Sequence, residues 1–270
     1  MSIAKIMVSL DLGPTVADRV RVAAGLSERF EATIVGVAAG KAEVPGLVGD
    51  IEAVQAAYDE ETTKLADELE QAKAVFTRNA GGAPRTEWRQ AEAAPETFLI
   101  RQARGADLVV VGREPPEDRA GRMVAAPGAV LMQVGRPVLV VPPGLRRLEA
   151  ARIVVAWKDG PEARRAVTAA LPFIARADQV FVASAGGDAR FEGAEDVSEL
   201  LARHGAHVTT HLLDAPAPEV ADEILCFANR QEADLVVMGG YGHSRLREWL
   251  LGGVTRDMLR ISPLCCLMSH

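Results

Sequence analysis

The chain has 270 residues, 49% of them hydrophobic, with a formal net charge of −7 and a pI of about 5.4. This length and composition suit two domains of ordinary size, each with its own packed core. The acidic balance argues against a nucleic-acid-binding surface, because phosphate contacts need clustered Lys and Arg.

The first half alternates short apolar runs with longer helical patterns. Strands are expected at 3–10, 32–37, 85–90, 108–111 and 138–141, and helices at 15–29, 51–79, 95–104 and 121–134. The pattern at 51–79 is the clearest, because it is periodic and rich in Ala, Glu and Lys.

The second half repeats this order. Strands are expected at 153–157, 180–184, 208–213, 235–238 and 264–268, and helices at 162–175, 194–204, 217–229 and in a segment that ends near Arg260. Strands alternating with helices indicate a parallel sheet, and valine runs without polar alternation indicate that both sheet faces are covered. The predicted fold class is α/β, with two tandem doubly wound, five-stranded, Rossmann-like domains.

Three pairs of matching segments indicate a duplication. ADLVVVG at 106–112 differs from ADLVVMG at 233–239 at one position, KIMVSLD at 5–11 matches RIVVAWK at 152–158, and RPVLVVP at 136–142 matches SPLCCLM at 262–268. The segment PPGLRRLEA lies between the copies, and its prolines and glycine mark an exposed connector. We therefore expect one domain at 1–143 and a second at 151–270.

A glycine-rich loop follows the fourth strand of the second half only. Its spacing is Gly239-x2-Gly242-x9-Gly252-Gly253, and Val254 and Thr255 come next. Glycines let the backbone approach a ligand closely, and the free N–H groups at the start of the following helix favour phosphate. A tight strand-to-helix turn with no ligand explains the glycines equally well.

This loop, the helix after it and the final strand resemble the universal stress protein family. The resemblance covers essentially the whole chain and is strongest at 234–268. It implies an adenine-nucleotide-binding α/β domain of the adenine nucleotide alpha hydrolase type, often dimeric or duplicated in tandem, and ATP, with or without Mg, as the cofactor. Carried over, it makes these residues nucleotide contacts: Ala156, Trp157, Lys158, Asp159, Ala183, Met238, Gly239, Gly242, Gly252, Gly253, Val254 and Thr255.

Two positions depart from the family pattern. Gly253 stands where the family usually has Ser or Thr, and Lys158 stands where an Asp or Asn usually follows the first strand. Lys158 either offers its ammonium group to phosphates or lies in solvent, and Asp159 is a substitute acceptor one residue along. Trp157 either stacks on the base or packs in the core.

The first half keeps the acidic residue, as Asp11, but loses the phosphate loop. Ala126 and Pro127 align with Gly252 and Gly253 when the final strands are matched. Proline is comfortable at a helix start, yet it removes an N–H group that a phosphate would use. The first half is therefore interpreted as a degenerate, nucleotide-free copy, with another small ligand as an open alternative.

Other polar clusters favour plainer interpretations. His204, His207 and His211 lack an evident third ligand and fit a polar surface strand better than a metal site. The glutamates of the 51–79 helix fit a solvated face, and His243, Ser244, Arg245 and Arg247 fit a helical turn or phosphate contacts. Cys226, Cys265 and Cys266 have no CxxC spacing, which fits a reduced, cytoplasmic protein without a metal.

Three functions remain open at this stage. The first is a cytoplasmic stress-response regulator that binds ATP in its second half. The second is a structural or interaction protein whose final strands, 139–141 and 264–267, pair within one chain or between two chains. The third is a slow ATPase, for which no general base or nucleophile is evident. No signal peptide or membrane helix is expected, because no apolar run reaches about 18 residues.

Overall fold

The structure is a computed structural model and describes residues 2–42, 51–81, 83, 85–114, 121–185, 193–214, 219–242 and 253–270. The first half contains β1 (Lys5–Leu10), α1 (Val16–Phe30), β2 (Thr33–Gly40), α2 (Ile51–Asn79), β3 (Arg85–Glu92), α3 (Pro95–Gln102), the 3-10 turn η1 (Ala103–Gly105), β4 (Leu108–Gly112), α4 (Pro127–Gln133) and β5 (Val138–Val141). The second half contains β6 (Arg152–Ala156), α5 (Pro161–Ile174), β7 (Gln179–Ala185), α6 (Ala194–Arg203), β8 (Val208–Leu213), α7 (Val220–Arg230), β9 (Leu235–Gly239), α9 (Val254–Ile261) and β10 (Cys265–Ser269).

All of these strands form one ten-stranded sheet in the order β3-β2-β1-β4-β5-β10-β9-β6-β7-β8. Neighbouring strands are parallel within each half of the chain. Read from their outer edges inward, both halves have the same order of third, second, first, fourth and fifth strand. The predicted α/β class with repeated doubly wound units is confirmed, while the domain limits 1–143 and 151–270 stay a prediction.

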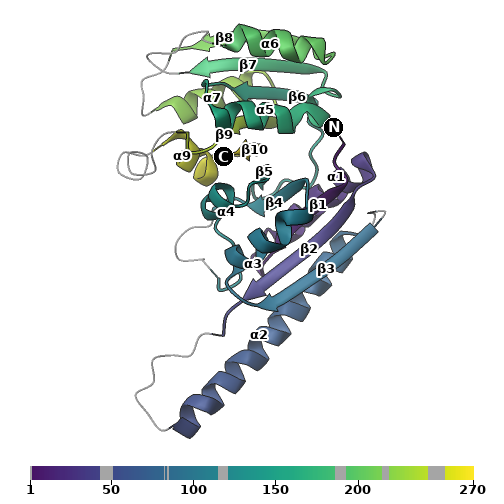
Figure 1. The fold of residues 1–270 in the computed structure, drawn as a ribbon, viewed down its shortest axis with the longest axis vertical. Helices are drawn as coiled ribbons and strands as arrows, with labels where there is room; N and C mark the ends of the chain where they lie inside the picture. The colour runs from purple at the N-terminus through teal and green to yellow at the C-terminus, as the bar shows by residue number, and fades with distance from the viewer. Residues whose placement is uncertain are drawn as a thin grey trace.

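The two halves meet where β5 and β10 run antiparallel. Val138 lies opposite Met268, Leu139 opposite Leu267 and Val140 opposite Cys266. Each of these side chains is at most 3% exposed. The ladder therefore continues through the middle of the molecule and leaves neither strand as a free edge, as Figure 1 shows.

Helices cover both faces of the sheet. One apolar cluster joins the sheet to buried residues of α1, α2, α5 and α6, and a second joins its other face to α3, α4, α7 and α9. This arrangement follows from strands such as LVVVG and LVVMG, which are apolar on both faces and must be covered on both.

Helix α4 is shorter than the sequence pattern predicted. The pattern indicated a helix over 121–134, but α4 begins at Pro127 and Ala126 is extended, with φ −62° and ψ 118°. A residue before proline is disfavoured in the helical region, so the helix cannot continue upstream through Ala126. The expectation at 121–126 was wrong for this reason.

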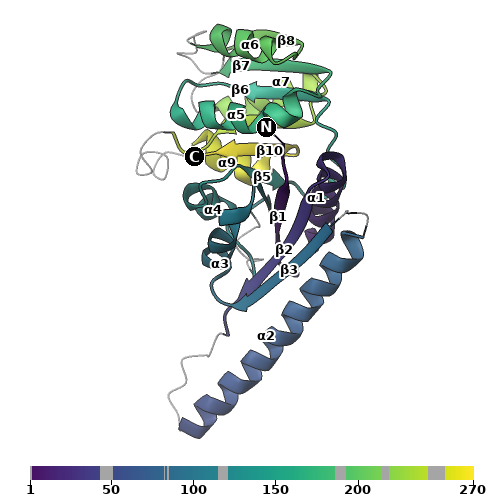
Figure 2. The ribbon, with the colours of Figure 1, turned by 45° about the vertical axis from the view of Figure 1, so that its right-hand side comes forward.

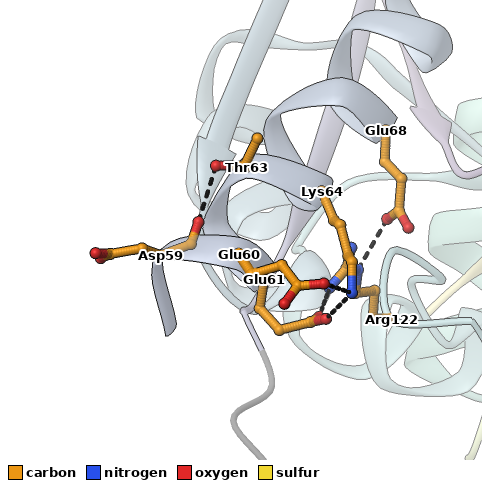
Figure 3. A network of polar contacts seen from close by, with 7 residues as sticks. All are labelled: Asp59, Glu60, Glu61, Thr63, Lys64, Glu68 and Arg122. Atoms are coloured by element: carbon orange, nitrogen blue, oxygen red, sulfur yellow. Dashed lines mark hydrogen bonds and ion pairs between the residues drawn. The ribbon is translucent and has the colours of Figure 1, made fainter. Parts of the chain in front are cut away.

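Helix α2 projects away from the rest of the molecule in both views (Figures 1 and 2). Its buried residues, Leu65, Leu69, Ala72 and Phe76, lie from the midpoint of the helix onward. Arg122 holds the middle of the helix, with ion pairs of 2.8 Å to both Glu61 and Glu68, while Lys64 bridges Glu61 and Glu60 (Figure 3). The ion pairs of Glu61 and Glu68 with Arg122 thus attach α2 to the segment that precedes α4.

Among the described helices, none is long and apolar enough to cross a membrane.

Candidate functional site

A hollow opens in the second half at the carboxyl ends of β6 and β9. These strands are neighbours in the sheet, and Ala156 lies opposite Met238. The empty volume is about 760 Å³ when the open mouth is counted. Its lining comprises Ala156, Trp157, Lys158, Glu162, Ala163, Ala183, Ala185, Val220, Ile224, Met238, Gly239, Gly242, Val254 and Thr255.

Most of the predicted contact residues converge on this hollow. They come from the ends of β6, β7 and β9 and from the start of α9. They are Ala156, Trp157, Lys158, Ala183, Met238, Gly239, Gly242, Val254 and Thr255. Asp159 and Gly253 do not line the hollow, and Gly252 lies outside the described residues, as do His243, Ser244, Arg245 and Arg247.

Gly239 and Gly242 are glycines for different reasons. A Cβ at Gly239 would lie 2.7 Å from the backbone nitrogen of Ala163, so the start of α5 leaves no room for a side chain. For a Cβ at Gly242, the nearest described atoms belong to the carboxylate of Glu162, at 3.1 Å. Packing therefore demands glycine at the end of β9, whereas at Gly242 the glycine keeps the hollow open.

Thr255 holds the loop that follows β9. The Tyr241 N–H donates a hydrogen bond to the Thr255 hydroxyl oxygen at 3.1 Å, and the Gly240 N–H donates to the Ser269 carbonyl at 2.8 Å. Tyr241 has a φ of 55°, a conformation that is uncommon for non-glycine residues. The Thr255 hydroxyl oxygen is the acceptor in this bond, so the bond does not use the hydroxyl proton.

The three residues that follow β6 differ in their burial and in their contacts. Trp157 is 4% exposed and belongs to the core, with its indole against Gly193, which favours the packing role over an open stacking face. Lys158 is exposed at the hollow. The Asp159 carboxylate pairs with the Arg164 guanidinium at 2.7 Å and does not line the hollow, so its role as a substitute acceptor stays a prediction.

Sequence reasoning missed Glu162. It lies in the first turn of α5, directly after Pro161 at the helix start, and its side chain is half-buried in the hollow. An acidic residue at that position ordinarily serves the helix dipole, so nothing in the local pattern marked it as a site residue. Its nearness to Gly242 comes from tertiary packing.

The matching place in the first half is filled by the protein itself. Arg19 of α1 is 5% exposed, and its guanidinium pairs with Asp11 at 2.6 Å. A Cβ at Gly112, which corresponds to Gly239, would lie only 2.2 Å from Nη1 of Arg19. Counted from the matching first strands, the second half has the small Ala166 where the first half has Arg19.

A model described as the universal stress protein family matches residues 182–270. The chain carries a universal stress protein domain. No curated protein matches the sequence. Among solved structures, a universal stress protein from Archaeoglobus fulgidus DSM 4304 is similar at 16% identity, with a TM-score of 0.72, covering 97% of this chain and 94% of that chain. A functionally unknown protein from Pseudomonas aeruginosa PAO1 is similar at 17% identity, with a TM-score of 0.55, covering 98% and 92%.

The universal stress protein match and the structural likeness cover different parts of the chain. The family match starts within β7 and includes Ala183, Met238, Gly239, Gly242 and Thr255. The two structural likenesses extend over both halves, and at such low identity they show the fold alone. The fold shared by both halves thus has independent support, while the ligand of the hollow has to be argued from its residues.

His211 and Cys266, two further polar candidates, lie in packed surroundings. His211 on the edge strand β8 lies 4.8 Å from the Phe227 ring, and burial lowers the pKa of this histidine. Within the described ranges, no group of three His, Cys, Asp or Glu could hold a metal. Burial raises the pKa of Cys266 to about 12, although a hydrogen bond to Ser262 opposes it, so the thiol stays protonated.

Proposed function

We propose that the hollow of the second half binds an adenine nucleotide, with ATP as the leading candidate, and that the protein is a regulatory component of the stress response in the cytoplasm. The observation that carries the proposal is the convergence of Ala156, Ala183, Met238, Gly242 and Thr255 on one hollow. The hollow lies where β6 has β7 on one side and β9 on the other, and doubly wound sheets bind their ligands at such a point.

The lining divides into an apolar part and a polar part. Ala156, Ala183 and Met238 supply apolar surface that suits the flat adenine base. At the other side, Gly242 leaves the backbone accessible and Thr255 offers its hydroxyl proton. Gly253 precedes the first turn of α9, whose free N–H groups favour phosphate. The arrangement supports binding with the base innermost and the phosphates toward α9.

The loop between Gly239 and Gly242 also rests on the first half, which gives nucleotide binding a route to the rest of the molecule. A Cβ at Gly240 would lie 2.6 Å from Leu131 of α4, and a Cβ at Gly128 would lie 2.7 Å from the Tyr241 hydroxyl. A ligand that favours one conformation of this loop therefore also favours one position of α4 against it. In this proposal the first domain, at 1–143, binds no nucleotide and is the partner of the second domain, at 151–270. The two domains pair within one chain, or two chains pair in a homodimer.

Replacing Gly242 with Val tests the proposal, because Gly242 lines the hollow and the three nearest described atoms to an added Cβ belong to the flexible Glu162 side chain. We expect purified protein to release about one adenylate per chain on denaturation, or to bind added Mg–ATP by calorimetry, and the variant to lose this binding by at least about tenfold, roughly 1.4 kcal/mol.

Gly105→Val is the matched control, since a Cβ there meets nothing within 4 Å and the residue lies in the other half. It should keep the full binding. Absence of any adenylate binding in the unmodified protein would contradict the proposal and favour a structural or interaction role, and multiple turnovers of ATP would favour the ATPase.

A further inference from the structure

We propose that the outer edge of β8 pairs with β8 of a second copy of this chain, antiparallel and centred on Thr210. β8 lies at one outer edge of the ten-stranded sheet and β3 at the other (Figure 1). Because β5 and β10 already pair with each other inside the chain, two chains cannot associate through these strands without opening the sheet. A homodimer therefore needs another surface, and pairing through β8 does not depend on a bound nucleotide.

The backbone of β8 presents a row of hydrogen-bonding groups outward. In the described ranges, β7 is the only strand beside β8. The Val180 N–H donates to the His207 carbonyl at 2.8 Å, so the backbone groups of His207 and of every second residue after it point toward β7. Those of Val208, Thr210 and Leu212 therefore point away from the sheet. Such a row is a template for pairing with another chain.

The two outer edges of the sheet differ in charge. β3 carries Arg85, Glu87, Arg89 and Glu92, and charged side chains on an edge strand discourage pairing with another chain. β8 reads VTTHLL and contains no Asp, Glu, Lys or Arg. Burial lowers the pKa of His211, so β8 is uncharged at neutral pH. The β8 edge thus lacks the protection that β3 has.

The side chains of β8 alternate between two faces of the sheet. The Thr210 hydroxyl lies 2.8 Å from that of Ser198, which places Thr210 on the face covered by α6, while His211 lies on the opposite face against α7. Val208 and Leu212 share the face of Thr210, because side chains alternate with a period of two. Leu212 is 46% exposed, so the edge of this face is open to solvent.

An antiparallel pair centred on Thr210 matches like with like on both faces. On the α6 face, Val208 of one copy lies opposite Leu212 of the other, and the two Thr210 side chains face each other. On the α7 face, Thr209 lies opposite His211. The outward-pointing backbone groups then meet each other, as an antiparallel ladder requires. A register shifted by two residues would instead place Thr210 opposite Leu212.

The proposed pair closes on itself. It has two-fold symmetry and uses β8 of both chains, so the outer edges that remain are the charged β3 strands. The junction repeats between chains the antiparallel contact that β5 and β10 make within one chain. Each copy contributes a strand of six residues, which is a small interface, so we expect a reversible dimer.

Sedimentation equilibrium from micromolar to near-millimolar chain concentration tests the pairing. We expect the unmodified protein to dimerise as its concentration rises. Leu212→Lys places a charge at the centre of the apolar pairs and should weaken the dimer at least about tenfold, roughly 1.4 kcal/mol. Leu12→Lys is the matched control, because Leu12 is 42% exposed and follows β1, far along the sheet from β8. It should dimerise like the unmodified protein.

Disulfide trapping tests the register, in a Cys226→Ser background because Cys226 is exposed. Facing Thr210 residues would have Cα atoms about 5.5 Å apart, within the range that a disulfide bridges, so Thr210→Cys should give a covalent dimer on oxidation. Val208→Cys is the control. Each Val208 lies opposite Leu212, four residues from the other Val208 and beyond the reach of a disulfide.

Three results would overturn the inference. The first is a chain that stays monomeric at every concentration, which would leave the β8 edge to solvent or to a strand of another protein. The second is a dimer that Leu212→Lys does not weaken, which would place the contact elsewhere. The third is cross-linking through Val208→Cys as efficient as through Thr210→Cys, which would contradict the register.

Discussion

Phe173→Ala should lower the free energy of unfolding by about 3–5 kcal/mol, the usual range for a large aromatic side chain removed from a core. Phe173 lies on α5 and is 0% exposed. Its ring meets Phe30, the last residue of α1, edge to face at a centroid distance of 5.2 Å. The substitution therefore opens a cavity and also removes a contact between the two halves of the chain. Urea denaturation followed by circular dichroism measures the change.

The surroundings of Phe30 explain why the contact is expected to matter. The Arg176 guanidinium lies over the Phe30 ring, 5.0 Å from its centre, and donates a hydrogen bond to the Arg29 carbonyl at 3.0 Å. The ring is thus enclosed by the second half on two sides. Phe173→Leu, which keeps much of the apolar volume, should cost less than Phe173→Ala.

A double-mutant cycle separates the contact from the cavity. We expect a coupling of about 0.5–1.5 kcal/mol between Phe30→Ala and Phe173→Ala, as for other aromatic pairs. Strict additivity would show that the halves are not energetically joined at this point. A loss below about 1 kcal/mol for Phe173→Ala would mean that the core collapses around the gap.

The elements that the sequence predicted well are those whose signal is local. The limits of α2, Ile51–Asn79, agree with the predicted helix because its composition and period are uniform along its length. The limits of β5, Val138–Val141, agree as well, since Pro137 and Pro142 bound its apolar run. The predicted start of α4 was wrong because a single proline, Pro127, overrides a composition that favours a helix.

The sequence could predict those residues of the candidate site that lie at the ends of neighbouring strands. Parallel strands end at the same edge of the sheet, so Ala156 and Met238 had to meet once β6 and β9 were neighbours. Glu162 and Arg19 could not be found in this way. Each is a charged residue on an amphipathic helix, which normally indicates a solvent-exposed position, and only the packing of glycines at the strand ends brings their side chains inward.

Arg19→Ala should lower the free energy of unfolding by about 3–5 kcal/mol, the range measured when one partner of a buried ion pair is removed. The side chains of Arg19 and Asp11 are 6% and 13% exposed, and their charged atoms lie 2.6 Å apart. Without Arg19, the Asp11 carboxylate keeps one hydrogen bond, from the Gly13 N–H at 2.8 Å, and is left as a buried charge. Thermal or urea denaturation at neutral pH measures the loss.

The double variant Asp11→Asn/Arg19→Met is the control, because it removes both charges while the asparagine oxygen can still accept from Gly13. Buried ion pairs replaced as a unit by groups of similar volume often cost little. We therefore expect the double variant to be clearly more stable than Arg19→Ala. Equal stability of the two would show that packing of the Arg19 side chain, and not its charge, is what the fold requires.

The same pair makes stability depend on pH in a definite direction. Burial raises the pKa of Asp11, but the attraction of Arg19 and the hydrogen bonds from Arg19 and Gly13 outweigh it, so the pKa lies below its ordinary value of 3.8. A carboxyl group whose pKa is depressed by folding stabilises the protein above its unfolded pKa and loses that contribution as the pH falls through the folded value. The free energy of unfolding should thus fall below about pH 4 in the unmodified protein. In the double variant the part of this fall due to Asp11 should be absent. An identical acid profile in both proteins would assign the acid sensitivity to other carboxylates and leave the Asp11–Arg19 pair without a measurable electrostatic role.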